Sequence, residues 1–354
     1  MMYTIKRCVF LVCGVAGVCI AALVNAHHGS VTNNALYLAD NPDEPVEVEG
    51  VIAEIFWRAP HIRYRMEDAE GEIWELEFSP SPVSFIRAGI TSEEFLRVGD
   101  FVRAAGFVSR RNERALGLSN LLLPNGLEHV GGMAGASVRW ADEPMTFGNL
   151  EPSPEKVAEA RRTANGIFRT WSIRQAPQPR TSEYQPYLSE RGREIAATMP
   201  QDESESLEHQ CMTGMPTAMF ERSRLRIEDQ GDRIHIWVEQ YNTHRYIYMD
   251  PETAPEPTYS NVGHSLGRWE GDDLIVHTSH VNHPTFDEGK TPQSDQATYV
   301  ERFSTRNDGE WLDYTFTITD PVMFSEPVTL EMPRQWIPGV DLHLWDCAPE
   351  WIDE

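Results

Sequence analysis

The segment from Gly263 to Asp272 reads Gly-His-Ser-Leu-Gly-Arg-Trp-Glu-Gly-Asp and concentrates side chains that can transfer protons. The imidazole of an unperturbed histidine such as His264 titrates near neutral pH, which suits it to act as a general acid or base. Ser265, Arg268 and Glu270 stand close to it in the sequence and can serve as polar partners. The pattern predicts that these residues form a catalytic group at the mouth of a barrel.

Two other interpretations of this segment are open. Its Gly-x-Ser-x-Gly pattern is similar to the nucleophile elbow of serine hydrolases. That motif requires a strand, a sharp turn and then a helix in an alternating α/β chain, whereas the residues that follow here indicate a hairpin. In a purely structural interpretation, Trp269 packs in a core, residues 270–272 form a turn, and His264 hydrogen-bonds within a barrel wall.

Aromatic and histidine side chains recur on the strands expected after residue 232. Most of the aromatic rings should be core, but some could line an apolar pocket for a small molecule. Residues three apart on a strand point to opposite faces, so His277 and His280 can both face a barrel interior only across a bulge. Usual zinc spacings are not met. The predicted ligand-binding residues are Trp237, Tyr241, Tyr248, His277 and His280.

A candidate metal site lies at the start of the predicted mature chain. If an export signal is cleaved after Ala26, His27 offers its α-amino group and imidazole, and His28 adds a second ring. Such nitrogen donors favour copper among the first-row metals, and His61 could be a third imidazole ligand. The arrangement resembles the histidine brace of copper monooxygenases and periplasmic copper carriers. The alternative is a flexible polar tail with opportunistic metal affinity.

Cys211 and Cys347 are the cysteines that lie outside the predicted export signal. In an exported chain two thiols are most simply read as one disulfide. The alternative is a pair of reactive or metal-bound thiols. Met212, Met215 and Met219 follow Cys211, and such sulfur ligands suit Cu(I). Methionine, however, more often fills irregular gaps in a core.

Residues 1–26 are predicted to be a cleaved export signal. Lys6 and Arg7 precede an apolar stretch that ends in Val-Asn-Ala at residues 24–26. This is the order of a positive region, an apolar region and a small-x-small cleavage site. A transmembrane anchor would need a longer apolar stretch and stop-transfer charges after it. We therefore expect a periplasmic or secreted protein with no membrane span after cleavage.

The charge of the chain excludes one class of partner. The 354 residues include 55 acidic and 30 basic side chains, which gives a net charge of −25 with histidine neutral. This charge repels a phosphate backbone and supplies none of the counterion release that drives nucleic-acid binding. Nucleic acids and anionic lipid surfaces are therefore not expected as partners.

Hydrophobic residues make up 40% of the chain, which is enough for a sizeable core, and its length favours two domains.

Residues 27–129 are expected to form a small OB-like β-domain. Alternating apolar and polar residues predict strands at 46–56, 62–66, 72–78, 101–108 and 115–123. Residues 91–94 read Thr-Ser-Glu-Glu, a helix start with a capping residue, between the third and fourth strands. Short strands with one helix at that position are the order of an OB-like barrel.

Residues 130–164 are interpreted as a linker with a short helix at 154–163, because glycine and proline punctuate them.

Residues 165–354 are expected to form a lipocalin-like antiparallel β-barrel that can hold one small molecule. A helix is predicted at 190–198. Strands are predicted at 224–228, 233–240, 243–249, 263–269, 273–280, 297–306, 311–319 and 328–332. The fold class is therefore all-β with minor helix, and a two-sheet sandwich is the alternative for the second domain.

Several short motifs match a known pairing of domains. They are His-His-Gly-Ser at 27–30, Trp-Arg-Ala-Pro-His at 57–61, the run at 263–272, Val-Glu-Arg-Phe at 300–303 and Asp-Pro at 320–321. Together they resemble a family of uncharacterised exported bacterial proteins, a domain of unknown function that typically begins with His-His-Ser and carries Trp-x-Asn-Pro-His, joined to a β-rich module. The family's usual His-Ser-Glu before Val-Glu-Arg-Phe is Gln-Ser-Asp at 293–295 here. The resemblance implies export but carries no established activity.

The leading hypothesis is an exported protein whose C-terminal barrel binds a small, largely apolar molecule. It could transform that molecule by acid–base catalysis at His264, as an isomerase, lyase or hydrolase. The second hypothesis is a periplasmic copper-binding or copper-handling protein that uses His27, His28 and His61. The third is a structural adaptor in an envelope assembly. The sequence contains no Rossmann glycine fingerprint, P-loop or zincin motif, so no organic cofactor is expected.

Overall fold

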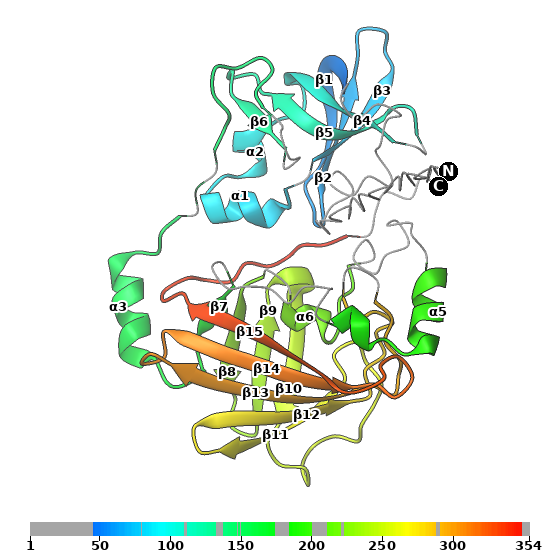
Figure 1. Cartoon of the computed structure of the whole chain (residues 1–354). Coiled ribbons are helices and arrows are strands. Elements are labelled where there is room, and N and C mark those ends of the chain that lie inside the picture. Colours follow the sequence, from blue (N-terminus) through cyan, green and yellow to red (C-terminus); the bar gives the residue numbers. More distant parts are fainter. Residues whose placement is uncertain are drawn as a thin grey trace, which may run out of the picture.

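The computed structural model describes residues 45–348 except 79, 110–111, 132–136, 147, 149, 174–183, 200–210, 221–222 and 288–290. The predicted export signal, with His27 and His28, lies outside the described residues. The described chain forms two closed β-barrels with a few short helices, so the fold is all-β with minor helix as predicted (Figure 1). Within the described part of the chain, no helix has the length and apolar character needed to cross a membrane.

The first barrel is built from the N-terminal strands. They are β1 (Val46–Phe56), β2 (Ile62–Glu67), β3 (Ile73–Phe78), β4 (Phe101–Val108), β5 (Ala115–Leu122) and the short β6 (Glu128–Val130). Their order is β3-β2-β1-β4-β5-β6, and a parallel pairing of β3 with β5 closes the barrel. The long β1 pairs with both β2 and β4. Gly50 permits this, because a Cβ there would lie 2.2 Å from the carbonyl oxygen of Glu67.

Two short helices close one end of this barrel between β3 and β4, where a helix was predicted. They are α1 (Pro82–Ala88) and α2 (Ser92–Phe95). Thr91 and Glu94 form a capping box at α2, in which the backbone N–H of Thr91 donates to Oε2 of Glu94 over 2.9 Å. Phe85 of α1 and Phe95 of α2 pack edge to face, with ring centroids 4.7 Å apart. The OB-like arrangement predicted from the strand and helix order is confirmed.

The helix α3 (Pro154–Thr163) joins the two barrels and lies along the outer wall of the second one (Figure 1). Ser153 caps its N-terminus by accepting from the backbone N–H of Lys156 over 3.3 Å. The Lys156 ammonium pairs with Asp341 at 2.6 Å, and Arg161 pairs with Glu310 at 2.8 Å. These contacts hold the predicted linker helix against the barrel.

The second barrel has nine strands. They are β7 (Thr170–Ser172), β8 (Leu225–Asp229), β9 (Arg233–Val238), β10 (Thr243–Tyr248), β11 (His264–Glu270), β12 (Asp273–Ser279), β13 (Thr298–Arg306), β14 (Trp311–Thr319) and β15 (Val328–Trp336). The predicted strands are all present. The structure adds β7, which pairs with both β15 and β8 and so closes the barrel. This strand is too short to show an alternating pattern in the sequence.

One neighbouring pair in this barrel is parallel. β10 and β11 run in the same direction, with Ile247 opposite Ser265, whereas the other neighbouring pairs are antiparallel. The connection through residues 249–263 must therefore run back along the barrel before β11 begins. Parallel neighbours need such a long crossover, while antiparallel ones can be joined by tight turns.

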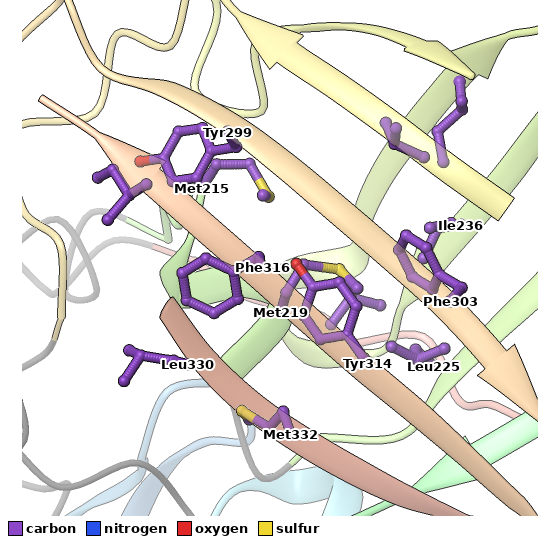
Figure 2. Packing of buried hydrophobic residues seen from close by; sticks show 14 of the residues in the cluster. Met215, Met219, Leu225, Ile236, Tyr299, Phe303, Tyr314, Phe316, Leu330 and Met332 are labelled. Carbon is purple, nitrogen blue, oxygen red and sulfur yellow. The ribbon is translucent and has the colours of Figure 1, made fainter. Parts of the chain in front are cut away.

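The interior of the second barrel contains a large cluster of buried apolar side chains (Figure 2). The rings of Phe303 and Tyr314 lie 4.7 Å apart between centroids, and Phe316 lies 5.8 Å from Tyr314. Met219 reaches the same cluster from the short helix α6 (Thr217–Phe220), which sits at one end of the barrel. A further helix, α5 (Glu190–Thr198), lies on the outside. The aromatic side chains of β13 and β14 thus act mainly as core, which was one of the predicted uses.

Cys211 and Cys347 form the predicted disulfide. Next to it the C-terminal segment docks on the first barrel: the backbone N–H of Ala59 donates to the carbonyl oxygen of Asp346 over 2.8 Å. Arg87 of α1 also reaches across and pairs with Glu239, a carboxylate that is completely buried. The same carboxylate accepts from the backbone N–H of His343 over 2.9 Å. Charged and backbone contacts therefore connect the two barrels.

Candidate functional site

The structure separates the four predicted catalytic residues of β11. Side chains alternate along this strand, so Ser265 points into the barrel and is 1% exposed, whereas His264, Arg268 and Glu270 lie on the outer face. Arg268 donates to Glu270 over 2.6 Å, and both side chains are about half exposed. Ser265 is therefore on the opposite side of the wall from its predicted partners.

His264 lies beside one of the predicted ligand-binding residues. Its ring is 5.7 Å from that of Tyr248 between centroids, with 21° between the planes. Burial lowers the pKa of His264, and the nearby His280 lowers it further. The structure thus brings Tyr248 of β10 and His264 of β11 together on the outer wall of the barrel.

The other predicted ligand-binding residues are also outside the barrel or at its ends. Trp237 lies on the outer face of β9, where its Nε1 donates to Oδ1 of Asn242 over 3.0 Å. His277 is exposed on β12. Tyr241 and His280 adopt positive φ values of 50° and 57° at strand ends. None of these side chains forms part of the buried interior cluster of described residues.

An ion pair occupies part of the barrel interior that the sequence did not reveal. Arg245 of β10 and Glu301 of β13 face each other there, and Nη1 of the arginine donates to Oε2 of Glu301 over 2.7 Å. Thr278 donates to Glu301 over 2.7 Å, and the Tyr314 hydroxyl donates over 2.9 Å. Ser265 accepts from Nη2 of Arg245 over 3.0 Å. The inward serine of the motif therefore completes a buried polar cluster.

The predicted copper site can be examined only in part. His61 directly precedes β2, and its Nδ1 lies 2.7 Å from Oε1 of Glu77 in β3. Within the described residues, no three histidine, cysteine, aspartate or glutamate side chains come together in a way that could hold a metal ion. His27 and His28 lie outside the described residues, so copper binding at the N-terminus stays a prediction.

Two adjoining grooves lie on the outer wall of the second barrel, between α3 and strands β7 and β8. Their volumes are about 490 Å³ and 450 Å³. Ala160 of α3, Thr170 of β7 and Arg226 of β8 line both. The larger groove is also lined by Ala164, Phe168, Arg169, Glu228, Asp229 and Trp336. We call the two together the α3 groove.

The α3 groove combines aromatic rings with guanidinium groups. The guanidinium of Arg169 lies over the Trp336 ring, 4.2 Å from its centroid, and donates to the carbonyl oxygen of Gly309 over 2.9 Å. Arg226 donates from Nε to Oγ1 of Thr170 over 3.1 Å. Phe168 is half-buried in the groove lining, and its ring packs edge to face on Trp269 with 6.0 Å between the centroids. The groove therefore offers apolar surface and charges of both signs to the same ligand, because Glu228 and Asp229 line it together with the two arginines.

A chain of side chains leads away from the groove along the outer wall. Glu228 lines the groove, and its Oε2 lies 3.0 Å from Nδ1 of His235. Nε2 of His235 lies 2.9 Å from Nδ1 of His244. These residues come from the neighbouring strands β8, β9 and β10. A carboxylate and two imidazoles are thus connected in series.

Sequence reasoning did not single out this chain, although a signal for it existed. Glu228, His235 and His244 occupy outward positions of their strands, because their neighbours Ile227, Ile234, Ile236 and Arg245 point inward and are buried. The strand register places Glu228 opposite His235 on β9. His244 on β10 lies opposite Trp237, two residues along β9 from His235. Parity along the predicted strands could have shown the shared face, but the register had to come from the fold.

No protein-family model matches this chain, and no curated protein matches it significantly.

Proposed function

We propose that this is an exported protein that binds one small molecule in the α3 groove. The observation that carries the proposal is the groove itself: about 490 Å³, lined by Trp336, Phe168 and two guanidinium groups. Sites for small molecules usually measure roughly 300–1,000 Å³ and combine apolar walls with a few polar groups. The Cys211–Cys347 disulfide supports export, because disulfides persist in oxidising compartments.

The lining favours an amphipathic ligand with an aromatic or apolar body and an anionic head. Phe168 and Ala160 provide apolar surface for the body, while Trp336 is 7% exposed and lies beneath the guanidinium of Arg169. Arg226 can hold the head, because its Nη2 makes only long contacts, 3.4 Å to the carbonyl oxygen of Val340 and 4.0 Å to Asp341. A ligand carboxylate or sulfonate could approach that guanidinium more closely and form charge-assisted hydrogen bonds.

The proposal moves the ligand from the barrel interior, where the sequence predicted it, to the outer wall. Buried aromatic side chains and the pair Arg245 and Glu301 occupy the described interior. The predicted acid–base residues His264, Arg268 and Glu270 also face outward. Binding in the interior stays a prediction, while the groove has a volume of about 490 Å³ and a defined lining.

Fluorescence titration with anilinonaphthalene sulfonate tests the proposal, because this dye has an aromatic body and an anionic head. Ala160→Trp should fill the groove and weaken binding at least about tenfold, since Ala160 lines both parts of it. Arg226→Gln should weaken binding by about tenfold or more, the effect of losing hydrogen bonds to a charged group. Mass spectrometry of small molecules released from the natively produced protein would then identify the ligand class.

The control for Ala160→Trp is Ala197→Trp, which adds the same side chain to an exposed position of α5. It should leave dye affinity unchanged. If Ala160→Trp and Ala197→Trp bind the dye equally well, the dye binds elsewhere and the groove is not the site.

A further inference from the structure

We infer that Glu228, His235 and His244 form a proton relay along the outer wall, from the exposed His244 to Glu228 in the α3 groove. The inference rests on the proposed function, because the relay serves a ligand that the groove holds. It assigns acid–base chemistry to the groove, with Glu228 as the group that meets the ligand. The two histidines act through Glu228 and do not touch the ligand.

The geometry of the two histidines is that of a direct hydrogen bond between imidazoles. Nε2 of His235 lies 2.9 Å from Nδ1 of His244, while the ring centroids are 5.1 Å apart and the planes differ by 14°. If the two rings overlapped face to face, their centroids would lie much closer together than the combined length of one N···N contact and two ring radii. The rings therefore meet edge to edge, which is the alignment in which a proton passes most directly.

The carboxylate fixes the direction of the chain. Ionised Glu228 can only accept, so Nδ1 of His235 must carry the proton that it donates to Oε2. Neutral His235 then has its lone pair on Nε2, and this nitrogen accepts from Nδ1–H of His244. The exposed Nε2 of His244 is left as the acceptor at the solvent end. Both histidines are thus held in the Nδ1–H tautomer.

The flanking side chains hold this arrangement in place. The ring of Tyr246 lies 5.0 Å from His235, with 21° between the planes, and Trp237 lies 5.8 Å from His244, with 18° between the planes. Arg233 lies over Tyr246 at 4.6 Å, and Arg226 is opposite Trp237 in the strand register. Burial lowers the pKa of His244 and so does His235, while Glu228 opposes both. Among the described residues, these charged and titratable groups flank the chain.

The relay carries protons from His244 to the groove, where Glu228 is 40% exposed and also meets solvent directly. A proton binds at Nε2 of His244, and the proton on Nδ1 of His244 passes to Nε2 of His235. The proton on Nδ1 of His235 then passes to Glu228, which becomes a neutral acid. Glu228 can give this proton to an oxygen or carbon of a groove ligand, so that its O–H bond breaks as the new bond to the ligand forms. Both imidazoles then carry their proton on Nε2, and the starting tautomers return when Glu228 takes a proton from the ligand and passes it outward along the same path.

The ligand class that fits is therefore an anionic amphipathic molecule with a site that takes up a proton, such as an enolate carbon or a departing oxygen. Arg226 would hold its anionic head on the same strand that carries Glu228, two residues away on the same face. This placement puts the acid and the anchoring cation on one side of the groove. No oxidant or reductant is needed for such a step.

Nitrogen-15 NMR of the histidine rings tests the relay directly. In the unmodified protein both His235 and His244 should be in the Nδ1–H tautomer, which is the minor form of a free histidine side chain. Glu228→Gln should populate the Nε2–H tautomer of His244, because an amide at position 228 can donate to Nδ1 of His235 as well as accept from it, and donation reverses the chain. A cluster held only by packing would not transmit a change at residue 228 to His244, which it does not contact.

The control is Glu270→Gln, the same chemical change on the outer wall in an exposed pair with Arg268. It should leave the His244 tautomer unchanged. Glu228→Asp, which keeps the charge but shortens the reach, is the second variant in case the amide disturbs folding, and it should also release His235 from the Nδ1–H tautomer. An Nε2–H tautomer of His244 in the unmodified protein, or an unchanged His244 in both Glu228 variants, overturns the relay.

Anilinonaphthalene sulfonate then links the relay to the groove. Saturating dye should raise the titration midpoint of His244 by about half a pH unit or more, because its sulfonate adds negative charge near Glu228. The same dye should have no such effect in Ala160→Trp. If the tautomers are as expected but the dye does not bind in the groove, the proposed function fails and the relay stands. If the dye binds in the groove and the tautomers are wrong, the relay alone fails.

Discussion

Arg245 and Glu301 form an ion pair inside the second barrel, where their side chains are only 2% and 0% exposed. Two buried charges are expensive to remove from water, and their attraction repays this only when further hydrogen bonds satisfy both groups. Ser265, Thr278 and Tyr314 supply those bonds. The pair therefore depends on five neighbouring strands, β10 to β14, being in register at once.

Replacing one member of this pair should be strongly destabilising. Arg245→Leu should lower the free energy of unfolding by about 3–5 kcal/mol, because it leaves the Glu301 carboxylate buried without its counter-charge. Urea unfolding measures the loss. Arg268→Leu breaks the half-exposed pair with Glu270 and should cost less than about 1 kcal/mol. Equal losses in the two variants would contradict the account of the buried pair.

Removal of the disulfide should destabilise the second barrel. Cys211 and Cys347 are 136 residues apart, so the chain-entropy argument predicts a loss of about 4–5 kcal/mol for the double variant Cys211→Ala with Cys347→Ala. The urea midpoint of the variant, compared with that of the oxidised protein, measures it. Reduction of the unmodified protein should reproduce the loss. A change of less than about 1 kcal/mol would show that the unfolded chain is not restricted by this bond.

Acid should destabilise the protein through His283. Burial lowers the pKa of His283 to about 4, below its ordinary value of 6.5. Between these values the unfolded chain binds a proton that the folded one does not, so stability falls as the pH drops from about 6.5 towards about 4. From about pH 7.5 to about pH 5 the loss should be roughly 2 kcal/mol. His283→Gln should reduce this dependence, measured by urea unfolding at both pH values.

The control for the acid prediction is His277→Gln, because His277 is exposed on the outer face of β12. Its variant should keep the pH dependence of the unmodified protein. A His283→Gln variant with the same pH dependence as the unmodified protein would mean that His283 does not contribute.

Contact between the barrels should depend on Arg87. This residue pairs with Glu239, which is completely buried, whereas Arg58 pairs across the same junction with Asp346 at 3.8 Å and both of those groups are exposed. Arg87→Ala should cost about 3–5 kcal/mol and Arg58→Ala less than about 1 kcal/mol. Calorimetry should show the two barrels unfolding at separate temperatures only in Arg87→Ala. A single transition in both variants would argue against this pair as the connection.

Much of the fold follows from local patterns. Alternation of apolar and polar residues predicted the strands of both barrels, and the Thr91 and Glu94 pair predicted the helix start. These signals are readable because a half-buried strand has a period of two and a cap acts within one helical turn. β7 was missed because its three residues are too few to show a period. The parallel pairing of β10 and β11 was missed because it depends on the path of residues 249–263.

The placement of site residues was predicted less well, and β11 shows why. Shifting the phase of a strand by one residue moves every side chain to the opposite face. The sequence places His264 and Ser265 side by side, but in the fold only Ser265 faces inward, where it meets Arg245. An arginine and a glutamate on strands usually face solvent, so nothing local indicated that Arg245 and Glu301 would be buried together.

The sequence by itself determined the strand and helix content, the cysteine pair and the class of the fold, because each depends on residue types and short periods. The tertiary structure decided which strands close the second barrel, that Arg245 and Glu301 pair inside it, and that the α3 groove lies beside Glu228. It also joined Glu228, His235 and His244 into one chain. These features depend on the register between strands and on contacts between distant segments, and such contacts exist only once the barrel has closed.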